Sequence, residues 1–268
     1  MRPISQLPAL ERIRGLLFDI DETLTTDGRL TAEAYAALER VRRSGRILVP
    51  ITGRPAGWCD HIARMWPVDA VVGENGAFYF RYRDGKLHKR YQEDDQVRAA
   101  KRARLGAVAA RILAQVPGCG VASDQAYRET DLAIDFCEDV PALPVAAAER
   151  IAGLMRDAGL TAKISSIHVN GWFGEYDKLA TTRQLFAEQF ATDLAASNAE
   201  YAFIGDSPND APMFAFFRNS VGVANVGRFA GKFDAEPKYV THGHAGEGFA
   251  EFAALLVAHP AVSAPGSR

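Results

Sequence analysis

The stretch Leu16-Leu17-Phe18-Asp19-Ile20-Asp21-Glu22-Thr23-Leu24-Thr25 decides the fold of this chain. An apolar run that ends in a turn-prone cluster of Asp and Thr predicts a buried parallel strand, covered on both faces. Asp19 and Asp21 then lie at the carboxyl end of that strand, where ligands bind in open α/β sheets. Residues two apart on an extended chain point the same way, so these carboxylates can serve one reaction centre as nucleophile and proton donor. The alternative is that Asp and Thr simply cap the following helix.

Strands and helices alternate on either side of a long central segment. A helix begins near Thr31 and stops at Ser44-Gly45, and strands over 47–51 and 69–72 flank a helix over 56–65. The alternation resumes at Asp177-Lys178, with a strand over 201–204 and a last helix over about 248–259. This order predicts an α/β fold with a Rossmann-like, doubly wound parallel sheet.

The central segment breaks the alternation. Arg83-Asp84-Gly85-Lys86 lies between two β-prone runs and predicts a hairpin. Beyond it, one long helix, a second helix around 151–158 and four short strands predict an inserted α+β cap, large enough for its own small core. The predicted division is a core over 1–83 and 173–260, a cap over 84–172 and a disordered tail over 261–268.

The composition limits the classes of function. With 268 residues and 48% hydrophobic content, the chain can build a packed interior. A formal charge of −2, from 31 basic and 33 acidic side chains, predicts neither a nucleic acid nor a membrane surface as a partner. We expect no membrane span and no secretory signal, because the apolar runs are too short. The three cysteines have no metal-ligand spacing and are interpreted as reduced thiols of a cytoplasmic protein.

Four separate motifs carry a resemblance to a known family. They are Asp19-Ile20-Asp21-Glu22-Thr23, Ile51-Thr52-Gly53-Arg54-Pro55, Lys178 at a helix start, and Gly205-Asp206-Ser207-Pro208-Asn209-Asp210. In this order they resemble the motifs of the haloacid dehalogenase-like (HAD) phosphohydrolases, over about residues 14 to 257. The cap and the return segment look most like subclass IIB, which includes the Cof-type proteins and the sucrose-phosphate and mannosyl-3-phosphoglycerate phosphatases. The resemblance implies a HAD-like core with a cap of the C2 type.

The paired acidic residues predict a metal site. A carboxylate can attack a phosphate monoester only after a cation offsets the repulsion, and Mg²⁺ takes hard oxygen ligands. Asp19 would supply one oxygen, and Asp206, at the end of a strand expected beside the first, a second. The resemblance adds the backbone carbonyl of Asp21 as a third ligand and places Asn209 and Asp210 in the supporting shell.

Donors rather than acids are needed around the transferred phosphoryl group. Thr52 offers a hydroxyl, the Gly53 region a backbone N–H, and Lys178 a point charge near a helix N-terminus. By resemblance, Asp19 forms an aspartyl-phosphate while Asp21 protonates the leaving alcohol and later takes a proton from water. Arg54 either contacts the substrate or pins a loop.

The remaining candidates lie in or near the cap. Arg128 and His168 sit near predicted strand ends, and we predict that one of them contacts the leaving group. The alternative is that both are ordinary surface residues. Asn75, in the Glu74-Asn75-Gly76 turn at the junction between core and cap, is a further candidate for lining the site.

We therefore predict a Mg²⁺-dependent phosphatase that acts on a phosphorylated sugar or a similar small metabolite. One alternative is a phosphomutase that resembles the phosphomannomutases. The other is a non-catalytic sensor that binds a sugar phosphate, which should show a broken motif, whereas the four motifs here are intact.

Overall fold

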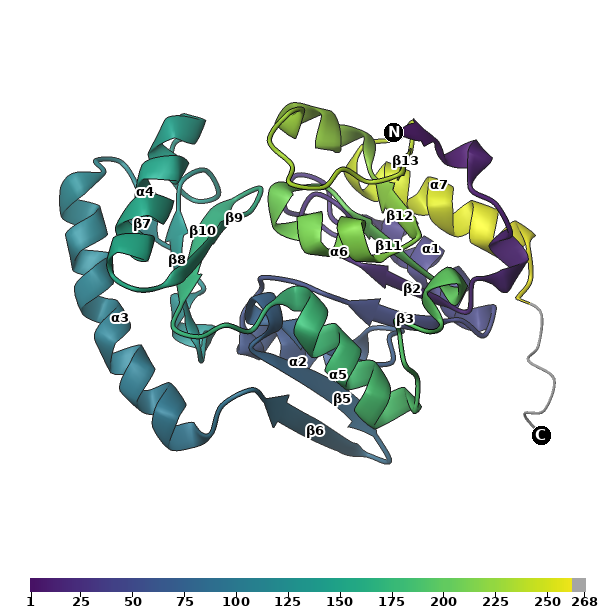
Figure 1. Cartoon of the computed structure of the whole chain (residues 1–268), viewed down its shortest axis with the longest axis horizontal. Helices are drawn as coiled ribbons and strands as arrows, with labels where there is room; N and C mark the ends of the chain where they lie inside the picture. Colours follow the sequence, from purple (N-terminus) through teal and green to yellow (C-terminus); the bar gives the residue numbers. More distant parts are fainter. Residues whose placement is uncertain (262–268) are drawn as a thin grey trace.

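The computed structural model describes residues 1–261, which form a larger core and a smaller cap that lie side by side (Figure 1). The predicted tail over 261–268 falls, apart from Ala261, outside the described residues. Among residues 1–261, no helix combines the length and the apolar character that crossing a membrane requires.

The core is built on a six-stranded parallel sheet in the order β1-β13-β12-β11-β2-β3. The strands are β1 Arg2–Pro3, β2 Gly15–Phe18, β3 Ile47–Pro50, β11 Tyr201–Gly205, β12 Asn219–Gly222 and β13 Tyr239–Val240. Every residue of β2 and β11 is buried, so the apolar run that ends at Phe18 forms the buried strand that the sequence predicts. Phe18 pairs with Ile204, which brings the residues that follow the two strands to one edge of the sheet.

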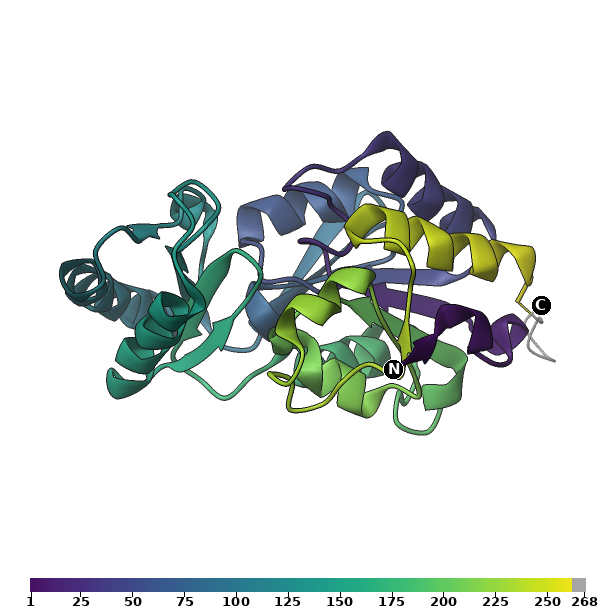
Figure 2. The same ribbon diagram turned by 90° about the horizontal axis from the view of Figure 1, so that it is seen from above.

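Helices cover both faces of this sheet, as Figure 2 shows from above. On one face, α1 (Ala32–Arg43) and α7 (Ala245–Ala258) pack onto Leu16 and Phe18. On the other, α5 (Lys178–Phe190) and α6 (Ala211–Phe216) pack onto Leu17. Successive residues of a strand point to opposite faces, so one apolar run fills both layers and the doubly wound prediction is confirmed.

A small antiparallel sheet continues the core toward the cap. It contains β4 (Val71–Gly73), β5 (Phe78–Arg83) and β6 (Lys86–Tyr91), and α2 (Ala56–Met65) packs against it. Asp84 and Gly85 join β5 to β6 with φ of +53° and +72°, which confirms the predicted Asp-Gly hairpin.

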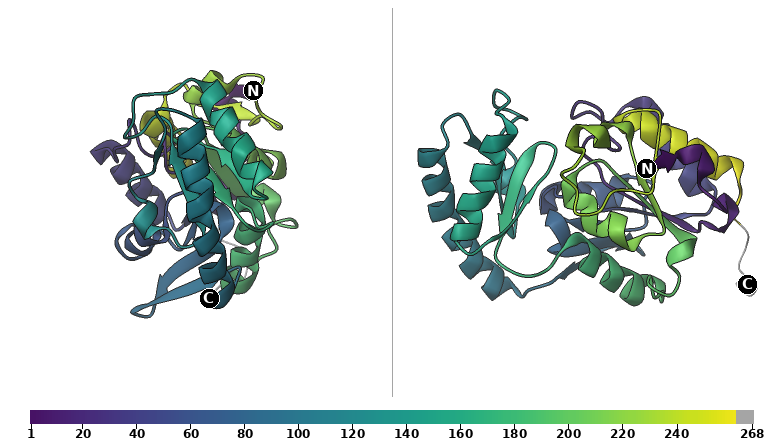
Figure 3. Two further views of the ribbon diagram at one scale, coloured as in Figure 1. Left: turned by 90° about the vertical axis from the view of Figure 1, so that its left-hand side faces the viewer. Right: turned by 45° about the horizontal axis from the view of Figure 1, so that its top comes forward.

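The cap has a four-stranded antiparallel sheet in the order β7-β8-β10-β9, with two helices on its outer face (Figure 3). Its elements are α3 Asp95–Gln115, β7 Gly120–Val121, β8 Asp131–Asp135, α4 Val145–Asp157, β9 Thr161–Ile164 and β10 His168–Trp172. Leu132, Ile134 and Val169 belong to the apolar cluster under the helices. Because side chains alternate along a strand, Asp131, His168 and Asn170 lie on the opposite face, toward the core. The division of the chain at residues 83 and 172 stays a prediction.

Candidate active site

Three buried carboxylates gather at the carboxyl edge of the core sheet. Asp19 follows β2, Asp206 follows β11, and Asp210 ends the short helix η6 (Pro208–Asp210). The three residues are between 0% and 5% exposed, and one oxygen of each lies within 4.8 Å of the others. The predicted meeting of Asp19 and Asp206 therefore has a direct geometric basis in the pairing of β2 with β11.

Lys178 neutralises part of this cluster. It is the first residue of α5, and its Nζ donates to Asp19 Oδ1 at 2.9 Å and to Asp210 Oδ1 at 2.8 Å. Gly76 lets the core–cap junction approach this helix end, because a Cβ at residue 76 would lie 2.1 Å from the carbonyl oxygen of Asp177. Burial would lower the pKa of Lys178, but the carboxylates of Asp19 and Asp210 outweigh it and raise that pKa.

The excess of negative charge suits a divalent cation with oxygen ligands. Burial raises the pKa of Asp19 to about 7, even though Lys178 acts to lower it, and burial also raises the pKa of Asp206 well above its usual range. Asp210 is already engaged, because its Oδ2 accepts from the backbone N–H of Asp206 at 3.1 Å and of Ser207 at 3.4 Å. Asp19 and Asp206 thus offer the oxygens, while Asp210 orients its neighbours, and the donor set fits Mg²⁺.

The second motif forms the wall beside the nucleophile. Thr52 is fully buried, and its hydroxyl accepts from the backbone N–H of Arg54 at 3.0 Å. A Cβ at residue 53 would lie 3.1 Å from Asn75 Nδ2, so glycine leaves room for that side chain. Asn75 Nδ2 is buried and has no hydrogen-bond partner among residues 1–261. A free, buried donor next to Gly53 is suited to binding an anionic oxygen.

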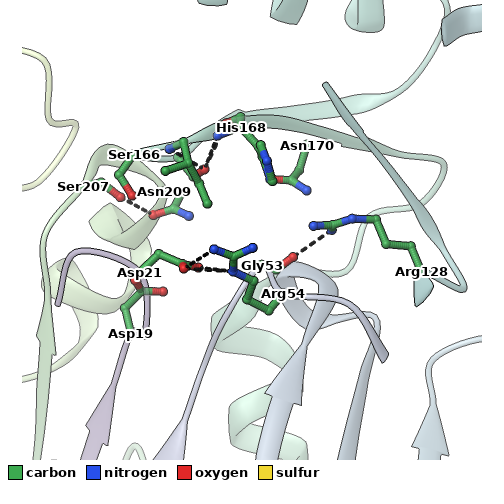
Figure 4. Close-up of a pocket in the computed structure, with 12 residues that line it drawn as sticks. Asp19, Asp21, Gly53, Arg54, Arg128, Ser166, His168, Asn170, Ser207 and Asn209 are labelled. Atoms are coloured by element: carbon green, nitrogen blue, oxygen red, sulfur yellow. Dashed lines mark hydrogen bonds and ion pairs between the residues drawn. The ribbon is translucent and has the colours of Figure 1, made fainter. Parts of the chain in front are cut away.

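Arg54 lies beside Asp21 at the centre of the site (Figure 4), and it also joins the core to the cap. Its Nε donates to Asp21 Oδ1 at 2.8 Å, and its Nη2 donates to Glu138 Oε1 at 2.6 Å. Nη1 lies 3.4 Å from Asp124 Oδ2, and the guanidinium carbon lies 4.4 Å from the ring centre of Trp58. The side chain is 4% exposed, so Arg54 pins a loop in this arrangement and also faces the pocket.

Arg128 is held on all sides by the junction between cap and core. Nε and Nη2 donate to Asp124 at 3.0 and 3.1 Å, and Nη1 donates to Asp131 Oδ1 at 3.0 Å and to the carbonyl oxygen of Gly53 at 2.8 Å. Arg128 is 4% exposed and His168 is 2% exposed, so the alternative that they are ordinary surface residues is wrong. His168 Nε2 lies 2.9 Å from Glu138 Oε2.

These residues enclose a narrow pocket between the core loops and the turn over residues 165–167, which joins β9 to β10 (Figure 4). It is lined by most of the predicted site residues, together with Ser165, Ser166, Ile167, Asn170 and Ser207. Asn209 also lines it, and its side-chain oxygen accepts from Ser207 Oγ at 2.8 Å. A wider cleft of about 500 Å³ lies alongside and reaches Asp206 and Glu138.

Sequence reasoning missed Glu138, Asp124 and the role of Glu74. Glu138 and Asp139 follow β8 much as Asp19 and Asp21 follow β2, and that pattern of acids after a strand was a usable signal. Glu74 is fully buried, and its carboxylate accepts backbone N–H bonds from Ala56 of the core and from Glu129 and Thr130 of the cap. Its pairing with a cap loop about 55 residues away is a tertiary feature that local pattern does not encode.

Comparison with known proteins agrees with this geometry. Residues 16–104 match the model of a family described as haloacid dehalogenase-like hydrolase. No curated protein matches the chain.

Several solved structures share the fold. A protein of Thermoplasma acidophilum is 18% identical with a TM-score of 0.67, over 91% of this chain and 98% of its own. The C-terminal domain of C. albicans trehalose-6-phosphate phosphatase is 13% identical with a TM-score of 0.68, over 98% of this chain and 100% of that domain. The sucrose-phosphatase of Synechocystis sp. PCC6803, solved with sucrose and phosphate, is 16% identical with a TM-score of 0.59, over 91% of this chain and 98% of the sucrose-phosphatase. In residues 16–104 this chain is similar to the haloacid dehalogenase-like hydrolases, and over nearly its whole length it shares the fold of these solved structures.

Proposed function

We propose that this chain is a Mg²⁺-dependent phosphatase that releases inorganic phosphate from a phosphorylated sugar or a similar small metabolite. The observation that carries the proposal is the position of Asp19, a buried carboxylate between Lys178 and Asp206 that faces the same pocket as Asp21. Solved phosphatases of sugar phosphates share the fold and support the class of substrate.

Asp19 is the proposed nucleophile. Lys178 binds its Oδ1, which fixes the carboxylate and leaves the other oxygen to attack phosphorus. The new O–P bond gives an aspartyl-phosphate, and the bond from phosphorus to the substrate oxygen breaks. That oxygen takes a proton from Asp21 and leaves as an alcohol.

The second step regenerates the enzyme. A water molecule attacks the aspartyl-phosphate and passes a proton to Asp21, which releases phosphate and restores the Asp19 carboxylate. Asp21 accepts that proton on its carboxylate, which the ion pair with Arg54 orients. In the first step Asp21 donates a proton, so the pair with Arg54 must loosen when substrate binds.

The metal would be held by Asp19, Asp206 and the backbone carbonyl of Asp21. When bound, it supplies positive charge that offsets the repulsion between Asp19 and the phosphate ester. Lys178 contributes a second positive charge, and the buried amide donor of Asn75 lies next to Gly53, which lines the pocket.

The experiment that tests the function is an assay for released phosphate over a panel of sugar phosphates, with and without Mg²⁺. We expect Mg²⁺-dependent release for at least one sugar phosphate and none with the Asp19→Asn variant. Isomer interconversion that requires a bisphosphate activator, without net release of phosphate, would instead show a phosphomutase. Binding without turnover of any kind would show a sensor.

A further inference from the structure

Glu138 is a cap carboxylate that reaches the candidate active site. It lies in the loop over residues 136–144 after β8, and it contacts both Arg54 of the core and His168 of the cap. Its side chain is 24% exposed, and it lines the wider cleft that also reaches Asp206. Glu138 therefore stands where the part of a substrate beyond the phosphate would enter the site.

The two arginines nearest to this position, Arg54 and Arg128, are already paired. Arg54 donates to Asp21, Glu138 and Asp124, and Arg128 donates to Asp124, Asp131 and the Gly53 carbonyl. An anionic group on a substrate would have to displace one of these buried carboxylates from its arginine. That exchange is unfavourable, because the displaced carboxylate would stay buried without a partner.

The wider cleft also has an excess of acidic side chains. Its lining includes four carboxylates, from Glu22, Asp27, Glu138 and Asp206, against one guanidinium, from Arg228. A metal bound at Asp206 would neutralise the charge of that carboxylate and leave the other three carboxylates without a metal. Contacts with His168 and Arg54 outweigh burial and lower the pKa of Glu138 to about 2, so Glu138 is charged at neutral pH.

We infer that Glu138 is a specificity-determining residue that rejects substrates with an anionic leaving group, so the enzyme takes phosphate monoesters of uncharged, hydroxyl-bearing molecules. This inference rests on the proposed phosphatase function. A carboxylate accepts hydrogen bonds from hydroxyl groups, whereas it repels a carboxylate or a second phosphate.

Lys163 is a cation on the same side of the cap that could instead favour an anionic substrate, so it provides a competing test. Lys163 of β9 lies directly opposite Asn170 of β10, so its side chain is on the core-facing side of the cap sheet. It has no carboxylate partner among the residues that the structure describes. If the cap recognised an anionic group, Lys163 rather than Glu138 would govern the selectivity.

The experiment compares two substrates that differ in charge at one end: glucitol 6-phosphate, which is neutral there, and 6-phosphogluconate, which carries a carboxylate. For the wild type, we expect kcat/KM to favour glucitol 6-phosphate by about tenfold to a hundredfold. Glu138→Gln should reduce this ratio at least fivefold, and because both substrates are measured on one variant, a general loss of activity cancels.

Asp139→Asn is the matched control. Asp139 is the neighbouring carboxylate, but it accepts from Ser123 Oγ at 2.6 Å and does not line the cleft. Its substitution should leave the ratio unchanged. A ratio at or below one in the wild type, or an unchanged ratio in Glu138→Gln, would overturn the inference. A preference for 6-phosphogluconate that Lys163→Ala abolishes would overturn it as well.

A binding measurement separates this inference from the proposed function. If no phosphate ester is hydrolysed, the phosphatase proposal fails, but calorimetric titration of the Asp19→Asn variant with the same two compounds still reports charge selectivity. Tighter binding of glucitol 6-phosphate supports the inference, and equal binding, tighter binding of 6-phosphogluconate or no binding of either overturns it.

Discussion

Nε of Arg54 donates to Oδ1 of Asp21 at 2.8 Å, and the same guanidinium reaches across to the cap through Nη2 and Glu138. One planar cation therefore orients the proposed proton donor and fastens the cap above it. A lysine would keep the charge but could not bridge two carboxylates with a rigid fork.

Arg54→Lys should for this reason lower kcat/KM about tenfold to a hundredfold for a sugar phosphate. Steady-state kinetics on the folded variant will measure the loss. The control is Arg64→Lys, since Arg64 forms an exposed ion pair with Asp60 and should stay within about twofold of the wild type. An Arg54→Lys enzyme with wild-type kinetics would show that the fork geometry is not needed.

Asp19→Asn should abolish turnover without unfolding the protein. We expect a loss of several orders of magnitude, since an amide is not a nucleophile toward phosphorus. The melting temperature should be unchanged or higher, because the substitution removes one of the crowded buried carboxylates. Circular dichroism and a thermal melt on the same preparation will separate the two effects, and a clean variant with substantial activity would contradict the assignment.

Mg²⁺ should stabilise the protein even in the absence of substrate. A cation between Asp19 and Asp206 relieves their repulsion, so the melting temperature should rise with the Mg²⁺ concentration and fall back on chelation. Asp206→Asn should lose most of this shift. Glu251→Gln, which alters a carboxylate that pairs with His242 away from the site, should keep it. A shift that survives in Asp206→Asn would place the ion elsewhere.

The sequence alone is sufficient to predict the core strands and the site residues that follow them. The run from Leu16 to Phe18 is apolar at each position, and a fully buried parallel strand has this pattern. Thr31 was a recognisable helix cap, and its hydroxyl does accept from the N–H of Ala34 at 3.2 Å. The short edge strand β1 was not predicted, because two residues give no periodic signal.

Contacts between cap and core were harder to predict. The sequence predicts that Arg128 or His168 contacts the leaving group, but Arg128 is enclosed by Asp124 and Asp131, whose positions depend on the folded cap. No local pattern predicts the contact of Glu138 with Arg54 in the candidate site. Both depend on side chains that meet only when the cap docks, which local spacing does not report.

Glu74 should make stability depend on pH. Burial raises its pKa to about 7, above the value of 4.5 expected in the unfolded chain. Between pH 4.5 and 7, the Glu74 carboxyl binds a proton in the folded state but not in the unfolded state. The stabilisation that comes from this proton is therefore fully present below pH 4.5 and is lost as the pH rises through 7. Between pH 5 and 8.5, the unfolding free energy of the wild type should fall relative to Glu74→Gln by roughly 2 kcal/mol.

Urea denaturation at the two pH values measures this difference. Glu149→Gln is the control, because the side chain of Glu149 is 61% exposed and should show the pH dependence of the wild type. If the unfolding free energies of Glu74→Gln and of the wild type change equally between pH 5 and 8.5, Glu74 does not hold an extra proton in the folded state.

Arg128 and His168 should separate into a structural residue and a recognition residue. Arg128→Met would leave Asp124 and Asp131 buried without a cation, which should cost about 3–5 kcal/mol of stability and lower activity equally on all substrates. His168 lines the pocket with its Nε2 2.9 Å from Glu138 Oε2, so we expect it to bind a leaving-group oxygen beside that carboxylate. His168→Ala should lower kcat/KM for the best sugar phosphate about tenfold more than for p-nitrophenyl phosphate, whose ring offers few polar contacts. Equal losses on both substrates would show that His168, like Arg128, holds the junction together and leaves recognition to other cap residues.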